Sequence, residues 1–314
     1  MSIFRTTYPF GLTRSIFGRL YRGLLSPAFW ENTCLALDEQ RPILEWPVNG
    51  KVSENWGDRL NPALVHLLSG QKPVPRSQVW NISFRSVHYM IGSGLGGVVD
   101  PNAVIYGTGF LKYSQKPKVL PRNIVSVRGP LSSQKYEEAG WPTSIPFGDM
   151  ALVLPHFYRP REYKARYEIG IIPHFREFNS DAWAYLRRSS NAKFIDICSP
   201  IVEVVEQIST CKVIASSSLH GLIAADAYGI PSVWVRASDS PRGDYFKFHD
   251  YLMSVNKYVE KPVRITEHVR AVDLINKASE ASCPLDINEL IERSPFSGSI
   301  VDDSNVILSI LERY

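Results

Sequence analysis

The chain has 314 residues, of which 44% are hydrophobic and 21% charged, as is typical of a globular protein with enough core for two domains. Its 35 Lys and Arg residues barely exceed its 31 Asp and Glu residues, and no basic block or interleaved aromatic–basic motif indicates a nucleic-acid partner. The four cysteines lie far apart without a CxxC pair, which argues against a zinc motif and favours a reducing compartment.

The N-terminal segment, residues 1–30, is basic: it contains four arginines and no acidic residue. Apolar residues recur at helical spacing from Leu12 to Leu25. Two interpretations stay open, a helix lying on an anionic membrane surface and a helix packed on its own domain. Arginines within the apolar stretch argue against a signal peptide, and no run reaches the roughly 20 apolar residues of a membrane span. We expect a cytoplasmic protein whose basic amphipathic segment is a candidate for peripheral binding to the inner membrane.

Val- and Ile-rich runs alternate with helical patterns along the rest of the chain, which predicts an α/β protein with parallel sheets. Residues 31–160 are expected to form a first Rossmann-like domain. Its helix opens near Asp58 with Pro62 in the first turn, and the stretch 154–168 is typical of a linker. Residues 161–314 are expected to form a second Rossmann-like domain with C-terminal helices.

A glycine-rich stretch in the first half satisfies G-x-G-x-x-G through Gly92, Gly94 and Gly97. A dinucleotide site also needs a helix that begins inside the motif, because the helix N-terminus carries the pyrophosphate. The residues that follow, 98–101, argue against such a helix. These glycines are therefore expected to allow close approach of the backbone, either to a ligand or to a neighbouring loop.

The second half contains two well-marked helices. One covers 199–209, with Ser199 as its N-cap and Pro200 at its first position. The other covers 219–228 between two strands and has His220 in its first turn. A helix N-terminus favours an anion and disfavours an imidazolium, so His220 is a candidate for acid–base chemistry beside a bound anion. Judged alone, a histidine in this position is more often a structural residue between sheet and helix.

Six motifs follow one another in an order that resembles the polysaccharide pyruvyl transferases: NWGD (55–58), IGSGLG (91–96), VSVRGPLS (125–132), FGDMALVLP (147–155), IGIIPHF (169–175) and SSSLHGLIAADAYGIPSVWV (216–235). The resemblance implies two Rossmann-like domains facing a cleft in a GT-B-like arrangement. It also implies transfer of pyruvate from phosphoenolpyruvate to a sugar of a lipid-linked exopolysaccharide or capsule repeating unit in bacteria, with release of phosphate. Family members often have arginine just before Leu-His-Gly, where this chain has Ser218, so another residue must supply that cation.

The candidate residues divide by role. Ketal formation needs cations for the phosphate and carboxylate of the donor and groups that transfer protons, but no metal and no cofactor besides the co-substrate phosphoenolpyruvate. The catalytic candidates are His220, Asp149 and Asp58, where each aspartate has an equally simple alternative as a turn or helix cap. The donor candidates are Arg128, for a bidentate contact, Arg236, as a replacement for the missing arginine, and His174, Ser217, Ser218 and Lys247, with Arg242 a weaker choice. The acceptor candidates are Asn55, Gly94 and Gly96.

The first domain is expected to hold the acceptor and the second the donor. Two other functions stay open on the same architecture. One is a glycosyltransferase that uses a nucleotide sugar, and the other is a non-catalytic protein that binds glycans or assembles other proteins.

Overall fold

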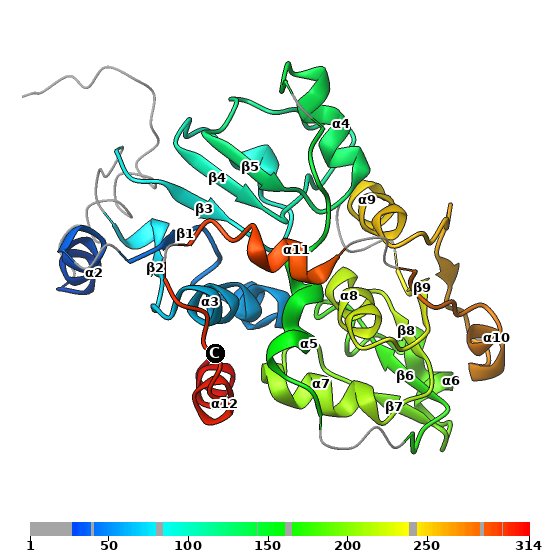
Figure 1. The fold of residues 1–314 in the computed structure, drawn as a ribbon. Coiled ribbons are helices and arrows are strands. Elements are labelled where there is room, and N and C mark those ends of the chain that lie inside the picture. Colours follow the sequence, from blue (N-terminus) through cyan, green and yellow to red (C-terminus); the bar gives the residue numbers. More distant parts are fainter. Residues whose placement is uncertain are drawn as a thin grey trace, which may run out of the picture.

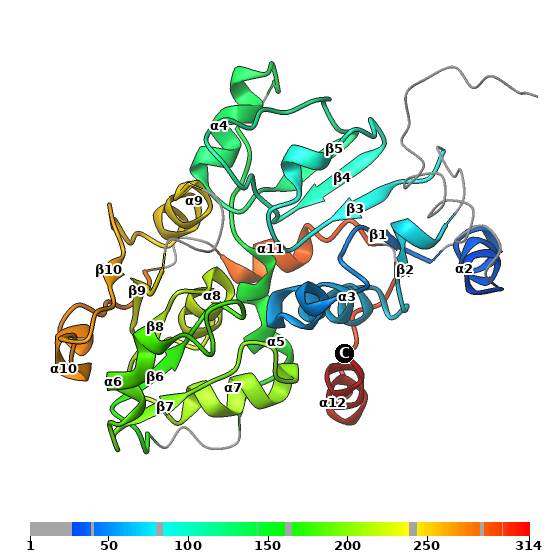
Figure 2. The same cartoon turned by 180° about the vertical axis from the view of Figure 1, so that it is seen from behind.

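The structure is a computed structural model that describes residues 27–38, 41–79, 84–142, 144–160, 165–238, 244–282, 286–296 and 298–314. Residues 1–26 of the predicted basic amphipathic segment (1–30) lie outside these ranges, and residues 27–30 are the first residues of helix α2 (Pro27–Asp38). Figures 1 and 2 show two α/β units, one above the other, with helices on the faces of each sheet.

The first unit contains a five-stranded parallel sheet in the order β2-β1-β3-β4-β5. Its strands are β1 (Ile43–Leu44), β2 (Val74–Pro75), β3 (Val87–Tyr89), β4 (Ala103–Tyr106) and β5 (Asn123–Ser126). Its helices are α2 (Pro27–Asp38), α3 (Trp56–Ser69) and α4 (Pro130–Glu138). The Gly-rich motif forms only a single 3-10 turn, Leu95–Gly97, so the absence of a dinucleotide-type helix at this point is confirmed.

The second unit repeats this plan in the order β10-β9-β8-β6-β7, again with all pairs parallel. Its strands are β6 (Ile169–Ile172), β7 (Ala192–Phe194), β8 (Ile214–Ser216), β9 (Ser232–Arg236) and β10 (Val263–Arg264). Its helices are α6 (Ala184–Arg187), α7 (Ile201–Ser209), α8 (Leu219–Ala227), α9 (Phe246–Ser254) and α10 (Ala271–Ile275). Counted in chain order within its own unit, each sheet has the order 2-1-3-4-5. The predicted α/β class with two Rossmann-like units is therefore confirmed.

The two units share one hydrophobic core. A single buried cluster joins Leu60 and Leu64 of α3 to Val204 of α7 and Leu222 of α8. Trp56 is fully buried at this junction: its backbone N–H donates to the Ile197 carbonyl at 2.8 Å, and its indole N–H donates to the Ile201 carbonyl at 3.3 Å. The start of α3 is thus fixed against the second unit.

The connecting and C-terminal segments also bring the units together. The chain passes between them through a 3-10 turn, Met150–Val153, and α5 (Leu154–Phe157), so the predicted linker is helical at its start. After β10 and α10, the chain returns through α11 (Ile287–Glu292) to α12 (Ser304–Arg313), which lies beside α3 in both views (Figures 1 and 2). Leu67 of α3 accepts a hydrogen bond from the Val301 N–H at 2.9 Å.

Two helix starts differ from the sequence prediction. Asn55 caps α3 by accepting a hydrogen bond from the Gly57 N–H at 3.2 Å, so the helix begins at Trp56 and Pro62 lies in its interior. Helix α7 begins at Ile201 with Pro200 as its N-cap, so the predicted cap at Ser199 is wrong by one residue. None of the described helices is both long and apolar enough to cross a membrane.

Candidate active site

The reversal of strand order marks the ligand edge of each sheet. In a 2-1-3-4-5 sheet, ligands bind beyond the carboxyl ends of the strands at the point where the order reverses. In the first unit this point lies between β1 and β3, and β3 leads into Gly92 and Gly94. In the second unit it lies between β6 and β8, where β6 leads into His174 and β8 leads into Ser217 and His220. The motifs that contain Gly92, His174 and His220 therefore lie at the two switch points.

His220 is the second residue of α8 and connects the two units. Its Nδ1 lies 2.7 Å from the side-chain oxygen of Asn55. Because an amide oxygen only accepts, Nδ1 carries the proton and Nε2 keeps a free lone pair. Nε2 makes no hydrogen bond within the described part of the chain. Removal of water from the ring, together with the positive charges of Lys247 and Arg128 and the neighbouring His174, lowers the pKa of His220 to about 3. His220 is thus a neutral imidazole with a free basic nitrogen.

Gly57 makes this contact possible. A Cβ on Gly57 would overlap the ring of His220, so only glycine allows the imidazole to lie against the first turn of α3. This role of Gly57 was not predicted from the sequence, although Gly57 belongs to the NWGD motif. The motif therefore has a physical function for three consecutive residues: Asn55 orients the histidine, Trp56 anchors the helix, and Gly57 leaves room for the ring.

His174 follows β6 and presents the opposite tautomer. Its Nδ1 accepts a hydrogen bond from the Arg176 N–H at 3.3 Å, so the proton lies on Nε2. Its ring stacks on Phe175. Burial and the charges of Lys247 and Arg176 lower the pKa of His174 to about 3. His174 is therefore a neutral N–H donor, whereas His220 is an acceptor.

Ser217 and Ser218 have different roles at the start of α8. The Ser217 hydroxyl accepts from the His174 N–H at 2.8 Å and donates to the buried carboxylate of Glu177 at 2.9 Å. It therefore holds the β6 loop against the β8 loop. Ser218 is the N-cap of α8 but makes no side-chain cap hydrogen bond. This arrangement leaves the Ser218 hydroxyl and the first N–H groups of the helix available for an anion.

Lys247 of α9 is the charged residue with the largest effect on both histidines, because its positive charge lowers the pKa of each. Burial and the charge of Arg128 lower the pKa of Lys247 to about 8, and Asp58 opposes that shift. Burial likewise raises the pKa of Asp58 to about 7, against the effect of Lys247. Within the described ranges, neither side chain makes a hydrogen bond or ion pair. Both charges are thus available to a ligand.

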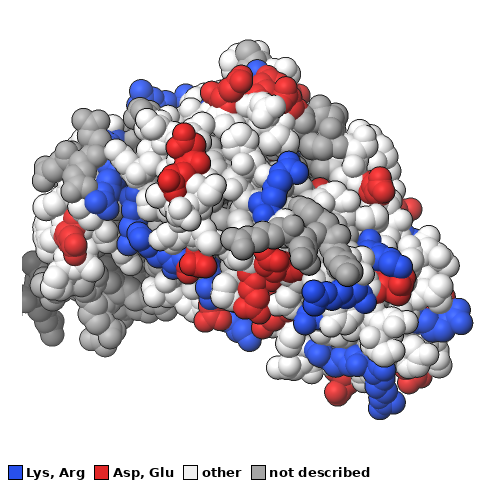
Figure 3. Space-filling model, turned by 60° about the horizontal axis from the view of Figure 1, so that its bottom comes forward, with Lys and Arg blue, Asp and Glu red and all other residues white. Residues whose placement is uncertain are grey.

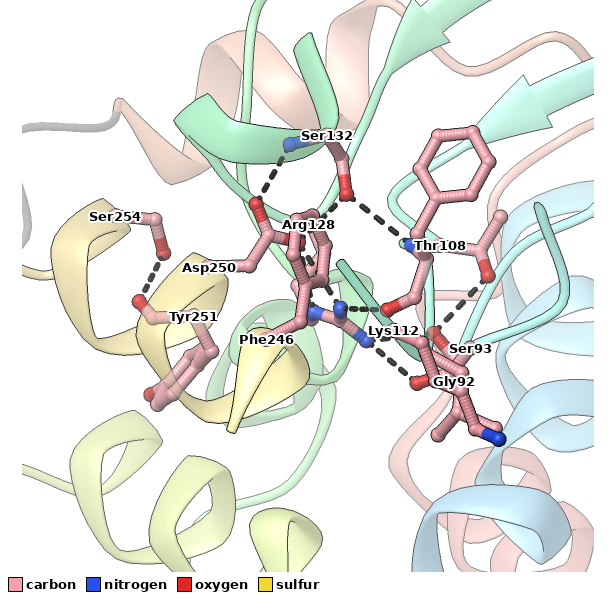
Figure 4. Close-up of polar contacts among 12 residues, drawn as sticks. Gly92, Ser93, Thr108, Lys112, Arg128, Ser132, Phe246, Asp250, Tyr251 and Ser254 are labelled. Atoms are coloured by element: carbon pink, nitrogen blue, oxygen red, sulfur yellow. Dashed lines mark hydrogen bonds and ion pairs between the residues drawn. The ribbon is translucent and has the colours of Figure 1, made fainter. Parts of the chain in front are cut away.

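Arg128 is fully buried, and each nitrogen of its guanidinium group has a hydrogen-bond partner (Figure 4). Its guanidinium donates to the Gly92 carbonyl at 3.1 Å, the Ser93 hydroxyl at 2.7 Å and the Phe110 carbonyl at 2.6 Å. Nε and Nη2 lie 3.1 and 3.0 Å from one carboxylate oxygen of Asp250. These five contacts match the five N–H donors of a guanidinium group. A bidentate contact with the donor would require at least one of them to be exchanged for the ligand.

Asp250, a residue that sequence reasoning missed, completes this cluster. It lies on α9 three residues after Lys247 and accepts hydrogen bonds from the backbone N–H and the hydroxyl of Ser132, at 2.8 and 2.7 Å. A Cβ on Gly129 would overlap the Asp250 backbone, so α9 packs directly on the start of α4. Nothing local in the sequence indicates this pairing. The cluster fixes the helix that carries Lys247 against the glycine loop of the first unit.

One carboxylate oxygen of Asp149 caps a turn, and the other is buried without a hydrogen-bond partner in the described residues. Oδ1 accepts from the Ala151 N–H at 3.0 Å and caps the 3-10 turn that follows. Oδ2 is buried and has no hydrogen-bond partner in the described residues. Burial raises the pKa of Asp149 to about 6, although the Ala151 N–H and Arg128 oppose the shift. The capping alternative is thus present in the structure.

The remaining candidates lie around this centre. Arg236 ends β9 and donates to the Ser238 carbonyl at 2.7 Å and to the Tyr245 hydroxyl. Gly94 donates its N–H to the Thr108 hydroxyl at 3.3 Å. Gly96 packs on Gln115, whose side chain a Cβ at this position would overlap. Arg242 lies outside the described residues.

A pocket of about 310 Å³ opens at the switch point of the first sheet, next to this centre. We refer to it as the β1–β3 pocket; the lining residues that matter below are Glu45, Trp46, Asp58, Tyr89, Ser93 and Gly94. A larger hollow of about 910 Å³ lies between α7 and α12 and contains none of the predicted site residues. On the face seen in Figure 3, basic and acidic side chains are interspersed. No group of three or more His, Cys, Asp or Glu within the described ranges is arranged to hold a metal ion.

Comparison with known proteins adds an independent observation. A family profile described as "Polysaccharide pyruvyl transferase" matches residues 55–239, a span that contains every predicted site residue except Lys247 and Arg242. The chain is 32% identical to "Uncharacterized protein L143" of Acanthamoeba polyphaga mimivirus, over 63% of this chain and 70% of that protein. It is 29% identical to "Succinoglycan biosynthesis protein ExoV" of Rhizobium meliloti (strain 1021), over 60% of this chain and 54% of that protein. Among solved structures, the wall teichoic acid polymerase TagF aligns at 10% identity with a TM-score of 0.38, over 96% of this chain and 98% of that one.

Proposed function

The chain belongs to the polysaccharide pyruvyl transferase family, and on this premise we propose that it transfers pyruvate from phosphoenolpyruvate to a sugar of a lipid-linked exopolysaccharide or capsule repeating unit. The products are a cyclic pyruvate ketal on two sugar hydroxyls and inorganic phosphate. One observation carries the proposal: the neutral ring of His220 packs against the first turn of α3. Asp58 and Lys247, whose side chains make no hydrogen bond or ion pair in the described residues, belong to the same site.

The donor is a small molecule with a carboxylate and a phosphate. We assign its binding to Lys247, to the Nε2–H of His174 and to the N–H groups and Ser218 hydroxyl at the start of α8. Lys247 supplies a point charge in a partly desolvated setting, where it attracts an anion more strongly than it would in water. Arg128 supports this site through Asp250 and α9. Arg236, at the end of β9, remains a candidate for donor binding, but it would have to exchange its contacts with Ser238 and Tyr245 for the donor.

The reaction moves three protons, one onto the methylene carbon and one from each of two hydroxyls, and these must balance. The methylene carbon of the donor gains a proton, which makes C2 electrophilic, and a sugar hydroxyl attacks C2 and loses its proton. Phosphate leaves from C2, and the second hydroxyl attacks the same carbon and loses its proton. One of the two hydroxyl protons replaces the proton given to the methylene carbon, and the other leaves on phosphate.

His220 and Asp58 are the groups suited to these transfers. Negative charge on a bound donor raises the pKa of His220 from its low value, so the imidazolium protonates the methylene carbon and regains a proton from a hydroxyl. Asp58 has a pKa near neutrality and takes the other hydroxyl proton. Asp149 acts indirectly: it caps the turn that follows it, and its carboxyl group interacts with the charge of Arg128.

The choice of donor is the most discriminating test of this proposal. Isothermal titration with phosphoenolpyruvate, uridine diphosphate and guanosine diphosphate separates the pyruvyl transferase from a nucleotide-sugar glycosyltransferase. We expect phosphoenolpyruvate to bind and the two nucleotides to have no effect on its binding. Tight nucleotide binding without phosphoenolpyruvate binding contradicts the proposal.

A lipid-linked acceptor lies at a membrane surface, and we propose that residues 1–30 bring the enzyme to it. Four arginines without an acidic residue favour anionic lipid. Deletion of residues 1–26 is expected to abolish flotation with vesicles that contain phosphatidylglycerol. Unchanged flotation contradicts this part of the proposal.

A further inference from the structure

The β1–β3 pocket has a lining unlike that of the donor site. Its lining residues include Glu45 and Asp58 but no Lys, Arg or His. Arg76 and Lys247 act on these carboxylates from outside the lining, but the charged side chains of the lining itself are acidic, which weakens the binding of a phosphate or a carboxylate. Phosphoenolpyruvate and nucleotides are therefore disfavoured among these lining residues, which do not include Lys247.

Four polar side chains of this pocket are open to a ligand, whereas the Ser93 hydroxyl accepts a hydrogen bond from Arg128. The side chains of Glu45, Trp46, Asp58 and Tyr89 make no hydrogen bond to any described residue. The floor, in contrast, is fixed: the Asn61 amide donates to the Ile91 carbonyl and its oxygen accepts from the Ile91 N–H, each at 3.2 Å. The pocket thus combines a rigid base with free acceptors and donors at its rim.

Size and shape restrict the ligand further. Trp46 and Tyr89 are half-buried, so both expose aromatic surface. A volume of about 310 Å³ is at the low end of the roughly 300–1,000 Å³ of small-molecule sites. Such a volume suits one ring with several hydroxyls better than a nucleotide. Aromatic surface packs against the C–H face of a sugar, while carboxylates accept hydrogen bonds from its hydroxyls.

From this geometry we infer that the β1–β3 pocket is a subsite for a single uncharged sugar ring, with Glu45, Trp46 and Tyr89 as the residues that select it. Asp58 is shared: its carboxyl group faces the hydroxyls of this ring and is also the group beside Lys247. The inference rests on the proposed function, because that function supplies a sugar acceptor. It assigns acceptor recognition to residues outside the family motifs.

Saturation-transfer NMR on the full chain tests the subsite without any need for turnover. The probes are the methyl glycosides of glucose, galactose and mannose and their 6-phosphates. We expect at least one neutral glycoside to bind and its 6-phosphate to bind at least tenfold more weakly. Saturating phosphoenolpyruvate is expected to leave the sugar signal in place. Absence of transfer from all three neutral sugars, or displacement by phosphoenolpyruvate, overturns the inference.

Two variants and a control link the signal to the pocket. Glu45→Gln removes one charge-assisted hydrogen bond without a change of shape and is expected to weaken sugar binding roughly tenfold. Tyr89→Leu removes aromatic surface and is expected to weaken it at least as much. Tyr258→Leu alters a tyrosine that is 78% exposed and lies outside the pocket, and it is expected to change nothing. Binding that survives both pocket variants overturns the inference.

The same variants separate this inference from the proposed function. If sugar binding depends on Glu45 and Tyr89 but no pyruvyl transfer occurs with any acceptor, the subsite stands and the proposed reaction fails. If transfer occurs and its acceptor KM is unchanged in both variants, the reaction stands and the subsite is wrong.

Discussion

Asn55 and His220 are 165 residues apart in the chain, yet the Asn55 side-chain oxygen lies 2.7 Å from Nδ1 of His220. The same oxygen also caps α3, which begins at the next residue. One amide therefore sets the start of a helix in the first unit and the tautomer of a histidine in the second. A change in the packing of the two units would therefore break the contact that keeps the proton on Nδ1 of His220 and leaves Nε2 basic.

His220→Gln preserves a polar side chain but removes the basic nitrogen. We expect kcat to fall by a factor of roughly 10² to 10⁴, which is the usual contribution of a proton-transfer group. The affinity for phosphoenolpyruvate is expected to change only a few-fold. His268→Gln is the matched control, because the side chain of His268 is 87% exposed. A normal kcat in the His220 variant contradicts the assigned role.

Gly57→Ala tests the close approach of α3 to the histidine. Alanine favours a helix by roughly 1 kcal/mol over glycine, so folding is expected to be retained. The added methyl group displaces the ring, however, and kcat is expected to fall at least tenfold. Gly97→Ala serves as the control, since a Cβ there meets no atom within 4 Å. Steady-state kinetics and thermal unfolding are measured together, and equal kcat values in the two variants argue against the packing explanation.

Lys247→Met keeps the aliphatic stem and removes the charge. If this lysine binds the anionic donor, the KM for phosphoenolpyruvate is expected to rise at least tenfold, and the acceptor KM is expected to stay nearly constant. Lys261→Met provides a comparison on an exposed lysine. An unchanged donor KM would assign the missing cation to Arg236 or to a residue outside the described ranges.

The buried pair of Arg128 and Asp250 is expected to stabilise the contact between α9 and the first unit. Either Arg128→Met or Asp250→Asn leaves a buried charge without its partner, and each is expected to cost about 3–5 kcal/mol of unfolding free energy. The double variant is expected to lose less than the sum of the two. Urea unfolding measures all three; losses below about 1 kcal/mol in the single variants contradict the inference.

The low pKa of His220 predicts how stability depends on pH. The unfolded chain binds a proton near pH 6.5, whereas the folded chain resists it until about pH 3. Between these values the unfolded state holds more protons, so the free energy of unfolding falls as the pH falls. His220→Gln is expected to flatten this slope between pH 4 and 6.5, whatever its effect on stability at pH 8. The midpoint of urea unfolding, measured across this range, gives the slope; parallel curves for parent and variant contradict the expectation.

The sequence predicted much of the fold because local patterns determine it. Helix α8 and the strands on either side of it follow from apolar runs, Gly229 and Pro231, and the first-turn position of His220 is visible without a structure. The absence of a dinucleotide-type helix after the glycine motif could also be foreseen. The errors at α3 and α7 are shifts of one or two residues, which arise because Asn55 and Pro200 act as N-caps.

The site was less predictable because long-range packing determines it. Arg128 was correctly identified as a residue at a strand end, but its five contacts come from three separate segments. The partner carboxylate, Asp250, has no sequence signature. The overlap that excludes a Cβ at Gly57 depends on a ring from the other unit. Such features require the folded chain.

The central claim is pyruvyl transfer from phosphoenolpyruvate to a sugar, and mass spectrometry tests it most directly. The protein is incubated with phosphoenolpyruvate and a panel of lipid-linked oligosaccharides, with phosphate release followed in the same samples. We predict that one acceptor gains the mass of a single pyruvate ketal, that phosphate appears in equal amount, and that His220→Gln loses both signals. Transfer of a sugar from a nucleotide donor, or ketal formation at the parent rate in the His220→Gln variant, would contradict the account.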